Sequence, residues 1–160
     1  MEPWNTEIFD LPPVEQFIRV SMRLIVASVL GGILGLEREK EGKPAGLRTH
    51  MLVSLGAALF TVAPLEAGMS IGDASRVFQG IAAGIGFLGA GTILKLTGEE
   101  EIKGLTTAAG LWLTAAIGMA VGAGHLWIPI LGVAIAFVIL AGVRVLEGRM
   151  NRARNKSKKQ

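Results

Sequence analysis

Residues 35–50, GLEREKEGKPAGLRTH, interrupt two apolar stretches of the chain, 24–36 and 51–65. Seven residues of this interruption carry a formal charge, whereas 51% of all residues are hydrophobic. A soluble protein can place such a run anywhere on its surface, but a membrane protein must keep it outside the hydrocarbon. If the chain spans a membrane, the run therefore fixes where the two flanking helices turn.

Five segments are apolar enough to predict helices that cross a bilayer. The expected helices cover 14–36, 48–65, 76–95, 104–124 and 126–145. A soluble bundle of 160 residues cannot bury five segments with almost no polar face, because no surface would remain for water. The 22 glycines also fit membrane helices, in which glycine lets backbones approach closely. We predict an all-α membrane protein with five transmembrane helices.

Lysine and arginine gather on one side of the predicted helices. If five helices cross, the loops after the first and third helices share a side with the C-terminal tail. Of the 16 Lys and Arg residues, only Arg19, Arg23 and Arg76 lie outside these segments and their immediate flanks. Cytoplasmic segments carry the excess of such residues, so this side is predicted to be cytoplasmic and the N-terminus outside. The expected parts are an extracytoplasmic segment 1–16, a transmembrane domain 17–146, and a basic cytoplasmic tail 147–160 that is frayed beyond the last helix.

A low-identity repeat relates the two halves of the domain. An Arg-Val pair opens the first and third helices at Arg19 and Arg76, 57 residues apart. A Gly-Leu-x-Thr motif precedes the second and fourth helices at Gly46 and Gly104, 58 residues apart. We interpret the first four helices as two parallel copies of one helical hairpin, with the fifth helix added.

The start of the second helix is the main candidate site. Its free N–H groups would face the cytoplasm beside Thr49, and Arg48 adds a planar donor suited to phosphate or carboxylate. Arg48, Thr49 and His50 thus predict a site for an anion, a phospholipid headgroup or an acidic partner. The alternative is that Arg48 pairs with Glu37 or Glu39 and only anchors the helix. The full set of candidate ligand or partner residues is Glu37, Arg38, Glu39, Arg48, Thr49, His50, Thr106 and Thr107.

Two further groups of residues have a candidate role. Arg19, Arg76 and Gln79 predict a polar cluster on the outer side, although ordinary anchoring explains them equally well. The third helix carries a set of glycines that predicts close helix packing or the lining of a pathway: Gly80, Gly84, Gly86, Gly89 and Gly91. In the fourth helix, Gly118 and Gly122 also predict close packing.

Several classes of function are excluded or disfavoured. The chain has no cysteine, so it has no disulfide, thiolate metal site or thiol nucleophile. Its two histidines, His50 and His125, lie on opposite predicted sides, and no nucleotide-binding loop occurs. We expect no enzyme activity, no cofactor and no nucleic-acid partner. The acidic run at 99–101 could concentrate a divalent cation, but a solvated loop is the ordinary interpretation, and the metal question stays open.

Four ordered motifs resemble a known family. They are Gly35-Leu-Glu-Arg-Glu, Lys43-Pro-Ala-Gly-Leu-Arg-Thr-His-Met-Leu-Val, Gly84-Ile-Gly-Phe-Leu-Gly-Ala-Gly-Thr-Ile and Gly104-Leu-Thr-Thr-Ala-Ala-Gly-Leu-Trp. Over roughly residues 17–146 the chain resembles the MgtC/SapB family of small bacterial membrane proteins, in a short form without the soluble C-terminal domain. The resemblance implies a plasma-membrane protein linked to growth in low magnesium, with the proton-translocating ATP synthase as a partner of the MgtC branch.

Two functions therefore remain open. The first is a non-enzymatic interaction protein that acts on a protein or lipid partner in magnesium or phosphate stress, through the charged loop and Arg48. The second is a small ion channel or transporter for Mg²⁺ or another ion. Its path would lie near the glycine-rich third helix, in a homo-oligomer. No Asp or Glu lies between Glu15 and Glu37 or within 52–65, 77–97 or 104–145, and this lack of carboxylates at membrane depth does not favour a Mg²⁺ path.

Overall fold

The computed structural model describes residues 12–95 and 102–157, and within them five helices and one short pair of strands. The elements in chain order are α1 (Val14–Lys40), α2 (Leu47–Glu66), α3 (Ile71–Gly91), β1 (Leu94–Lys95), β2 (Ile102–Lys103), α4 (Leu105–Gly122) and α5 (Trp127–Ser157). The two strands pair antiparallel, with Leu94 opposite Lys103. The acidic run at 99–101 and the first eleven residues lie outside the described residues.

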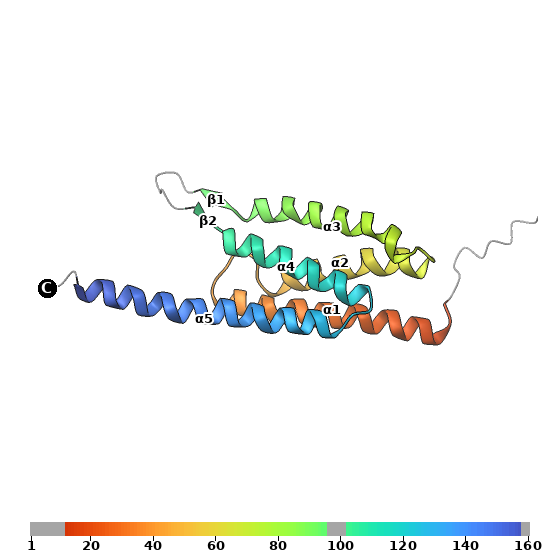
Figure 1. Ribbon diagram of the computed structural model, residues 1–160, viewed down its shortest axis with the longest axis horizontal. Helices are drawn as coiled ribbons and strands as arrows, with labels where there is room; N and C mark the ends of the chain where they lie inside the picture. Colours follow the sequence, from red (N-terminus) through yellow and green to blue (C-terminus); the bar gives the residue numbers. More distant parts are fainter. Residues whose placement is uncertain (1–11, 96–101, 158–160) are drawn as a thin grey trace, which may run out of the picture.

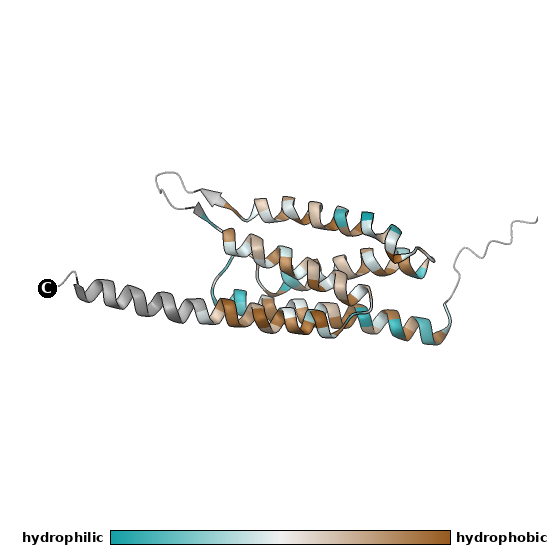
Figure 2. Cartoon of the chain, viewed as in Figure 1, coloured by the Kyte–Doolittle hydropathy of each residue, from teal (hydrophilic) through white to brown (hydrophobic). Residues whose placement is uncertain are grey.

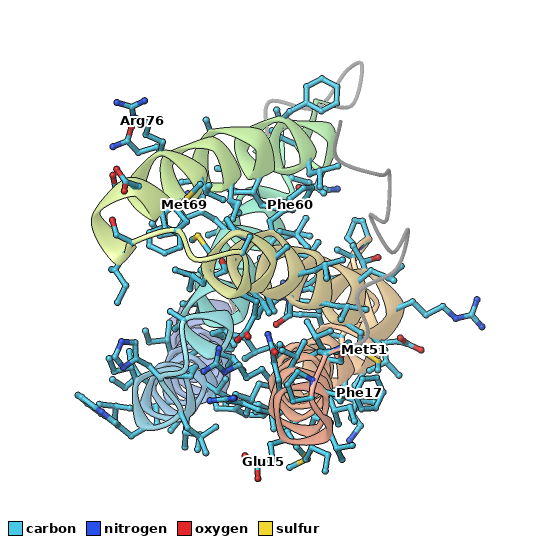
Figure 3. The ribbon with its side chains drawn as sticks, turned by 90° about the vertical axis from the view of Figure 1, so that its right-hand side faces the viewer. Glu15, Phe17, Met51, Phe60, Met69 and Arg76 are labelled. Atoms are coloured by element: carbon cyan, nitrogen blue, oxygen red, sulfur yellow. The ribbon has the colours of Figure 1, made fainter. Side chains whose placement is uncertain are left out.

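The helices alternate in direction along the bundle (Figure 1). Helices α1, α3 and α5 run one way, and α2 and α4 run the other, with α2 and α4 between α3 on one side and α1 and α5 on the other (Figures 1 and 3). The loop at 41–46, the strands β1 and β2, and the end of α5 therefore lie at the same end of the bundle, which we call the loop end. This is the arrangement that the charge distribution predicts for five crossings.

Several helix boundaries differ from those predicted. Helix α1 continues through its charged residues to Lys40, because Glu, Arg and Lys are good helix formers, and it stops before Gly42, whose φ is +63°. Helix α3 begins five residues early because Ser70 caps it: the Ser70 Oγ accepts from the Asp73 N–H at 3.1 Å. It also ends at Gly91, so that Lys95 lies in β1. Helix α5 continues to Ser157, so the start of the tail is helical where fraying was predicted.

Helices α2 and α4 end in the same way, as the repeat predicts. After α2, Gly68 has φ +89°, and the Met69 N–H donates to the Pro64 carbonyl at 2.9 Å. After α4, Gly124 has φ +90°, and the His125 N–H donates to the Ala120 carbonyl at 3.0 Å. Both are glycine-terminated Schellman motifs, in which the left-handed glycine carries no Cβ penalty.

The outside of the bundle is strongly apolar. Helix α1 exposes large side chains at helical spacing along one face: Ile18, Met22, Ile25, Val29, Ile33 and Leu36. Helix α5 exposes Trp127, Leu131, Ile135, Val138 and Ile139. Figure 2 shows the hydrophobic residues along the middle of α1 and the first half of α5. Exposed apolar patches of this extent indicate a surface that faces lipid.

Three described helices are long and apolar enough to cross a membrane, namely α1, α2 and α4. Helix α5 has a shorter apolar part, Trp127–Gly142, and α3 is not among the candidates. The first turns of α3 are polar, with Asp73, Arg76 and Gln79, and its glycines add little hydropathy. The protein is an all-α membrane protein. That α3 and α5 also cross remains a prediction from their place in the bundle.

Helices α1, α2 and α4 pack with their backbones in close contact. An added Cβ at Gly31 would lie 2.6 Å from the His50 carbonyl oxygen, and one at Gly35 would lie 2.7 Å from the Leu47 Cα. On α4, an added Cβ at Gly122 would lie 2.8 Å from the Ala58 carbonyl oxygen. These glycines replace side-chain interlocking by direct helix contact, as is common in membranes. The predicted packing role of Gly118 and Gly122 is thus what the structure shows.

Candidate functional site: a buried polar hub at the loop end

The last turns of α1 and the first turns of α2 bring charged and polar side chains into the interior. Arg38 is 4% exposed and His50 is 1% exposed. The Arg38 Nη1 lies 3.7 Å from the Glu37 Oε2, and both side chains are largely buried. Ser54, one turn after His50, and Thr107 of α4 are also buried. We call Glu37, Arg38, His50, Ser54 and Thr107 the polar hub.

The ring of His50 is fixed between two helices. Its Nδ1 lies 3.0 Å from the Gly46 carbonyl oxygen, which can only accept, so Nδ1 carries the proton and donates. The Nε2 is then the acceptor atom of the ring. It faces α4, where an added Cβ at Gly110 would lie 3.6 Å from it. The small residue at 110 therefore lets α4 cover the imidazole.

The hub contains polar atoms without a hydrogen-bond partner in the described structure. They include the Nε and Nη2 of Arg38 and the Oγ of Ser54. A buried guanidinium is costly unless its N–H groups are bonded, and groups of this kind usually bind water, an ion or a polar partner. Within the described bundle, the hub therefore holds a buried charged group, the Arg38 guanidinium, that can make a further polar contact.

Helix α2 does not present Arg48, Thr49 and His50 on one face. Each residue turns a helix by about 100°, so His50 points inward while Arg48 and Thr49 are exposed. The same split separates exposed Thr106 from buried Thr107 on α4. The sequence-based prediction of a joint Arg48-Thr49-His50 site is not the arrangement that the structure shows.

The carboxylates that might have paired with Arg48 are engaged elsewhere. Glu37 pairs with Arg38, and the Oε2 of exposed Glu39 accepts from the Leu47 N–H at 2.8 Å. Glu39 thus satisfies a free N–H group in the first turn of α2, where negative charge is favourable. Arg48 is consequently presented at the surface beside a helix start that is held firmly on α1.

The predicted outer cluster of Arg19, Arg76 and Gln79 does not form. All three are exposed, and Figure 3 shows Arg76 on α3 across the bundle from Glu15 at the start of α1. The polar contact at this end instead joins Arg23 to Glu66, with the Arg23 Nη1 3.5 Å from the Glu66 Oε1.

Arg23 and Glu66 each make one more contact at this end of the bundle. The Gln16 Nε2 donates to the Glu66 Oε2 at 2.8 Å, and the Arg23 Nη1 donates to the Gly122 carbonyl at 3.4 Å. Glu66 is the sequence signal for this contact. It is the sole acid in the apolar segment 51–66, so its carboxylate needs a cation nearby.

The glycines of α3 divide into two kinds. An added Cβ at Gly89 would lie 3.4 Å from the Ala108 Cβ, so this glycine packs against α4. At Gly80, Gly84, Gly86 and Gly91 an added Cβ would meet no atom within 4 Å. The predicted close packing at Gly80 and Gly84 is therefore absent within the described chain. Gly91, with Phe87 and Leu88, lines a pocket of 390 Å³ beside α2 and α4.

Among the described residues, no group of three or more His, Asp or Glu side chains is placed to hold a metal ion. The interior offers a cation, Arg38, next to a single carboxylate, Glu37. This arrangement suits an anion or a neutral polar group better than Mg²⁺, which prefers several oxygen ligands.

Comparison with known proteins identifies one matching family and several similar relatives. Residues 24–149 match the model of the MgtC family. SrpB of Synechococcus elongatus is 40% identical over 146 residues, which make up 84% of this chain and 80% of SrpB. The Escherichia coli protein named "Putative magnesium transporter YhiD" is 42% identical over 126 residues, 74% of this chain and 58% of YhiD.

Protein MgtC of Brucella abortus is 46% identical over 122 residues, 75% of this chain and 48% of MgtC. The chain thus spans about half the length of YhiD and MgtC, but most of SrpB. No solved structure matches it. The glycine, threonine and charged motifs that build the hub lie within the matched region, and the chain belongs to the MgtC family.

Proposed function

We propose that the chain serves in magnesium homeostasis or stress adaptation as a non-enzymatic protein of the bacterial plasma membrane. It acts by contact with a protein or lipid partner, with the loop end in the cytoplasm and the N-terminus outside. The name of YhiD, which refers to magnesium transport, supports the link to magnesium. A membrane protein such as the ATP synthase is the protein partner that the family resemblance suggests, and a homo-oligomer is the expected state.

The observation that carries the proposal is how α2 begins. Glu39 accepts from Leu47, and His50 donates to Gly46, so the first turn of α2 is tied down from both sides. Arg48 and Thr49, between these two contacts, point outward and are exposed. A rigid, exposed arginine at a positively charged membrane face is a good anchor for an acidic surface.

Replacing Arg48 by glutamate is expected to abolish rescue by the full chain in a bacterial strain that lacks its own family member and grows poorly at limiting magnesium. Charge reversal at an interface costs several kcal/mol, so partner capture by in-cell cross-linking should fall about tenfold or more. The readouts are growth rate at limiting magnesium and the cross-linked yield. Arg76→Glu, an exposed arginine on α3 at the opposite end, is the matched control and should rescue fully. Full rescue by Arg48→Glu would contradict the proposal.

A channel or transporter is the second candidate, favoured by the pocket beside the glycine-rich α3. Its wall is almost entirely apolar, which does not suit a hydrated divalent ion. Purified protein in liposomes loaded with a Mg²⁺-sensitive dye distinguishes the two candidates. Reproducible flux that a bulky residue at Gly91, which lines the pocket, abolishes would favour transport, whereas the absence of flux leaves the interaction role.

A further inference from the structure

One edge of the buried Arg38 guanidinium makes no hydrogen bond among the described residues. This edge carries the Nε and Nη2 atoms, and neither of them has a hydrogen-bond partner there. The ion pair with Glu37 uses a different atom, because the Glu37 Oε2 lies 3.7 Å from Nη1. That distance is longer than an N–H···O hydrogen bond. Glu37 therefore balances the charge of Arg38 but leaves both donors of the edge for another group.

The geometry of this edge selects the kind of group that can complete it. The N–H bonds of Nε and Nη2 are parallel, so they match two oxygens of one carboxylate or phosphate. A single carbonyl or water oxygen cannot make both bonds in good geometry. The side chain of Arg38 is 5% exposed, so bulk water does not hydrate these donors. Buried charged groups are stabilised by full hydrogen bonding, which an oxyanion would supply here.

Arg38 lies at the level where α4 begins. An added Cβ at Gly35 of α1 would lie 2.9 Å from the His50 Cβ, and one at Gly110 of α4 would lie 3.6 Å from the His50 Nε2. These three residues therefore share one level of the bundle, in which α1 also packs against α4. Arg38 follows Gly35 by three residues toward the loop end, and buried Thr107 precedes Gly110 by three residues toward the same end. One helical turn thus brings Arg38 and the first turn of α4 to the same level.

Two helices direct their positive ends to this level. A helix N-terminus carries about half a unit of positive charge and favours anions. The first turn of α4 holds no acidic residue, and its N-cap residue, Gly104, has no side chain to accept the free N–H groups. Helix α2 starts beside α1, since an added Cβ at Gly35 would lie 2.7 Å from the Leu47 Cα. Because Glu37 already balances Arg38, these helix starts are what favours a charged acceptor over a neutral one.

We propose that the hub binds a small oxyanion of the phosphate class, held by the Nε and Nη2 of Arg38 at the positive end of α4. The ion enters from the loop end, since Arg38 lies two residues before the end of α1. Inorganic phosphate and the phosphate of a lipid headgroup share this chemistry. The deep burial of Arg38 disfavours the carboxylate of a folded partner protein. The site requires neither the magnesium role nor the partner proposed above.

The test is isothermal titration calorimetry of the purified, delipidated full chain with inorganic phosphate, at an ionic strength held constant with chloride. Wild type is expected to bind phosphate saturably, at one ion per chain. Arg38→Lys keeps the charge but loses the paired donors, so it should bind phosphate about tenfold more weakly or worse. Arg76→Lys is the matched control, because it makes the same substitution at an exposed arginine at the opposite end. It should bind phosphate as wild type does.

A second arm of the test distinguishes the two sources of phosphate. The titration is repeated in nanodiscs of phosphatidylcholine alone and in nanodiscs that also contain phosphatidic acid. An affinity for phosphate that phosphatidic acid leaves unchanged assigns the site to the free ion, and a lowered affinity assigns it to the headgroup. No phosphate binding by wild type in detergent or in phosphatidylcholine nanodiscs would overturn the proposal. So would equal affinities of wild type and folded Arg38→Lys.

A measurement on wild type alone keeps the proposal testable if Arg38→Lys does not fold. A ligand that binds only the folded state stabilises it. Phosphate should therefore raise the SDS fraction at which wild type unfolds, whereas chloride at the same ionic strength should not. Equal unfolding in the two salts would count against the site. These measurements use neither cells nor magnesium, so the growth experiment can fail without affecting them.

Discussion

Replacing Arg38 by methionine is expected to lower the free energy of unfolding by about 3 kcal/mol, since removing one member of a buried ion pair typically costs that much or more. Methionine reproduces the aliphatic part of the arginine side chain, so the loss reports the guanidinium: its charge, its hydrogen bonds and the space that it filled. Arg38 is 4% exposed and lies beside Glu37, whose carboxylate would keep its burial but lose this cation. The measurement is reversible unfolding in mixed micelles by increasing SDS fraction, followed by circular dichroism.

Arg48→Met is the control for Arg38→Met, because Arg48 is an exposed arginine ten residues along the same polar stretch. It should change the stability by less than about 0.5 kcal/mol. A double variant, Glu37→Gln with Arg38→Met, should recover part of the loss, since it removes both charges together. If Arg38→Met unfolds at the same SDS fraction as wild type, the hub does not hold α1 in place.

Replacing Gly118 by alanine is expected to destabilise the bundle by about 2 kcal/mol, because overpacking of 1–3 kcal/mol exceeds the gain of up to about 1 kcal/mol in helix propensity. An added Cβ at Gly118 would collide with the Ser54 carbonyl oxygen and lie 3.0 Å from the Ala57 Cβ. Neither atom can rotate away, since one is backbone and the other is fixed to it. The same SDS titration measures the effect.

Gly56→Ala provides the matched control for Gly118→Ala. Gly56 lies in the middle of α2, on the partner helix, and an added Cβ there meets no atom within 4 Å. This variant should be neutral or stabilised by up to about 1 kcal/mol. Equal behaviour of the two alanine variants would show that α2 and α4 do not approach as closely as described.

The helix count and the ends of the bundle could be predicted from the sequence, because apolar runs and charge distribution report directly on membrane crossing. The Gly118 and Gly122 contact was also predictable, since small residues four apart share a helix face. The start of α3 was missed, although Ser70 and Asp73 form a capping pattern that the sequence displays. The strands β1 and β2 are two residues each and lack any periodicity to detect.

Glu37, Arg38, His50 and Thr107 of the hub were among the candidate residues, whereas Ser54 and the geometry of the hub were not predicted. Motif spacing identified Arg38, Arg48 and His50 as neighbours in sequence, yet which of them faces inward depends on how α1 and α4 pack on α2. That packing is set by glycines such as Gly35 and Gly110, whose role appears only when the helices are placed together. For the same reason Arg23, rather than Arg19, meets Glu66 at the opposite end.

The central claim is that the chain lies in a membrane with its loop end in the cytoplasm. The chain has no cysteine, so single cysteines report accessibility without background. Lys43→Cys lies in the exposed loop after α1, and Met69→Cys lies in the exposed turn after α2 at the opposite end. In intact spheroplasts, a membrane-impermeant maleimide is predicted to label Met69→Cys at once and Lys43→Cys only after the membrane is permeabilised. Labelling of Lys43→Cys in intact spheroplasts, with Met69→Cys protected, would contradict the account.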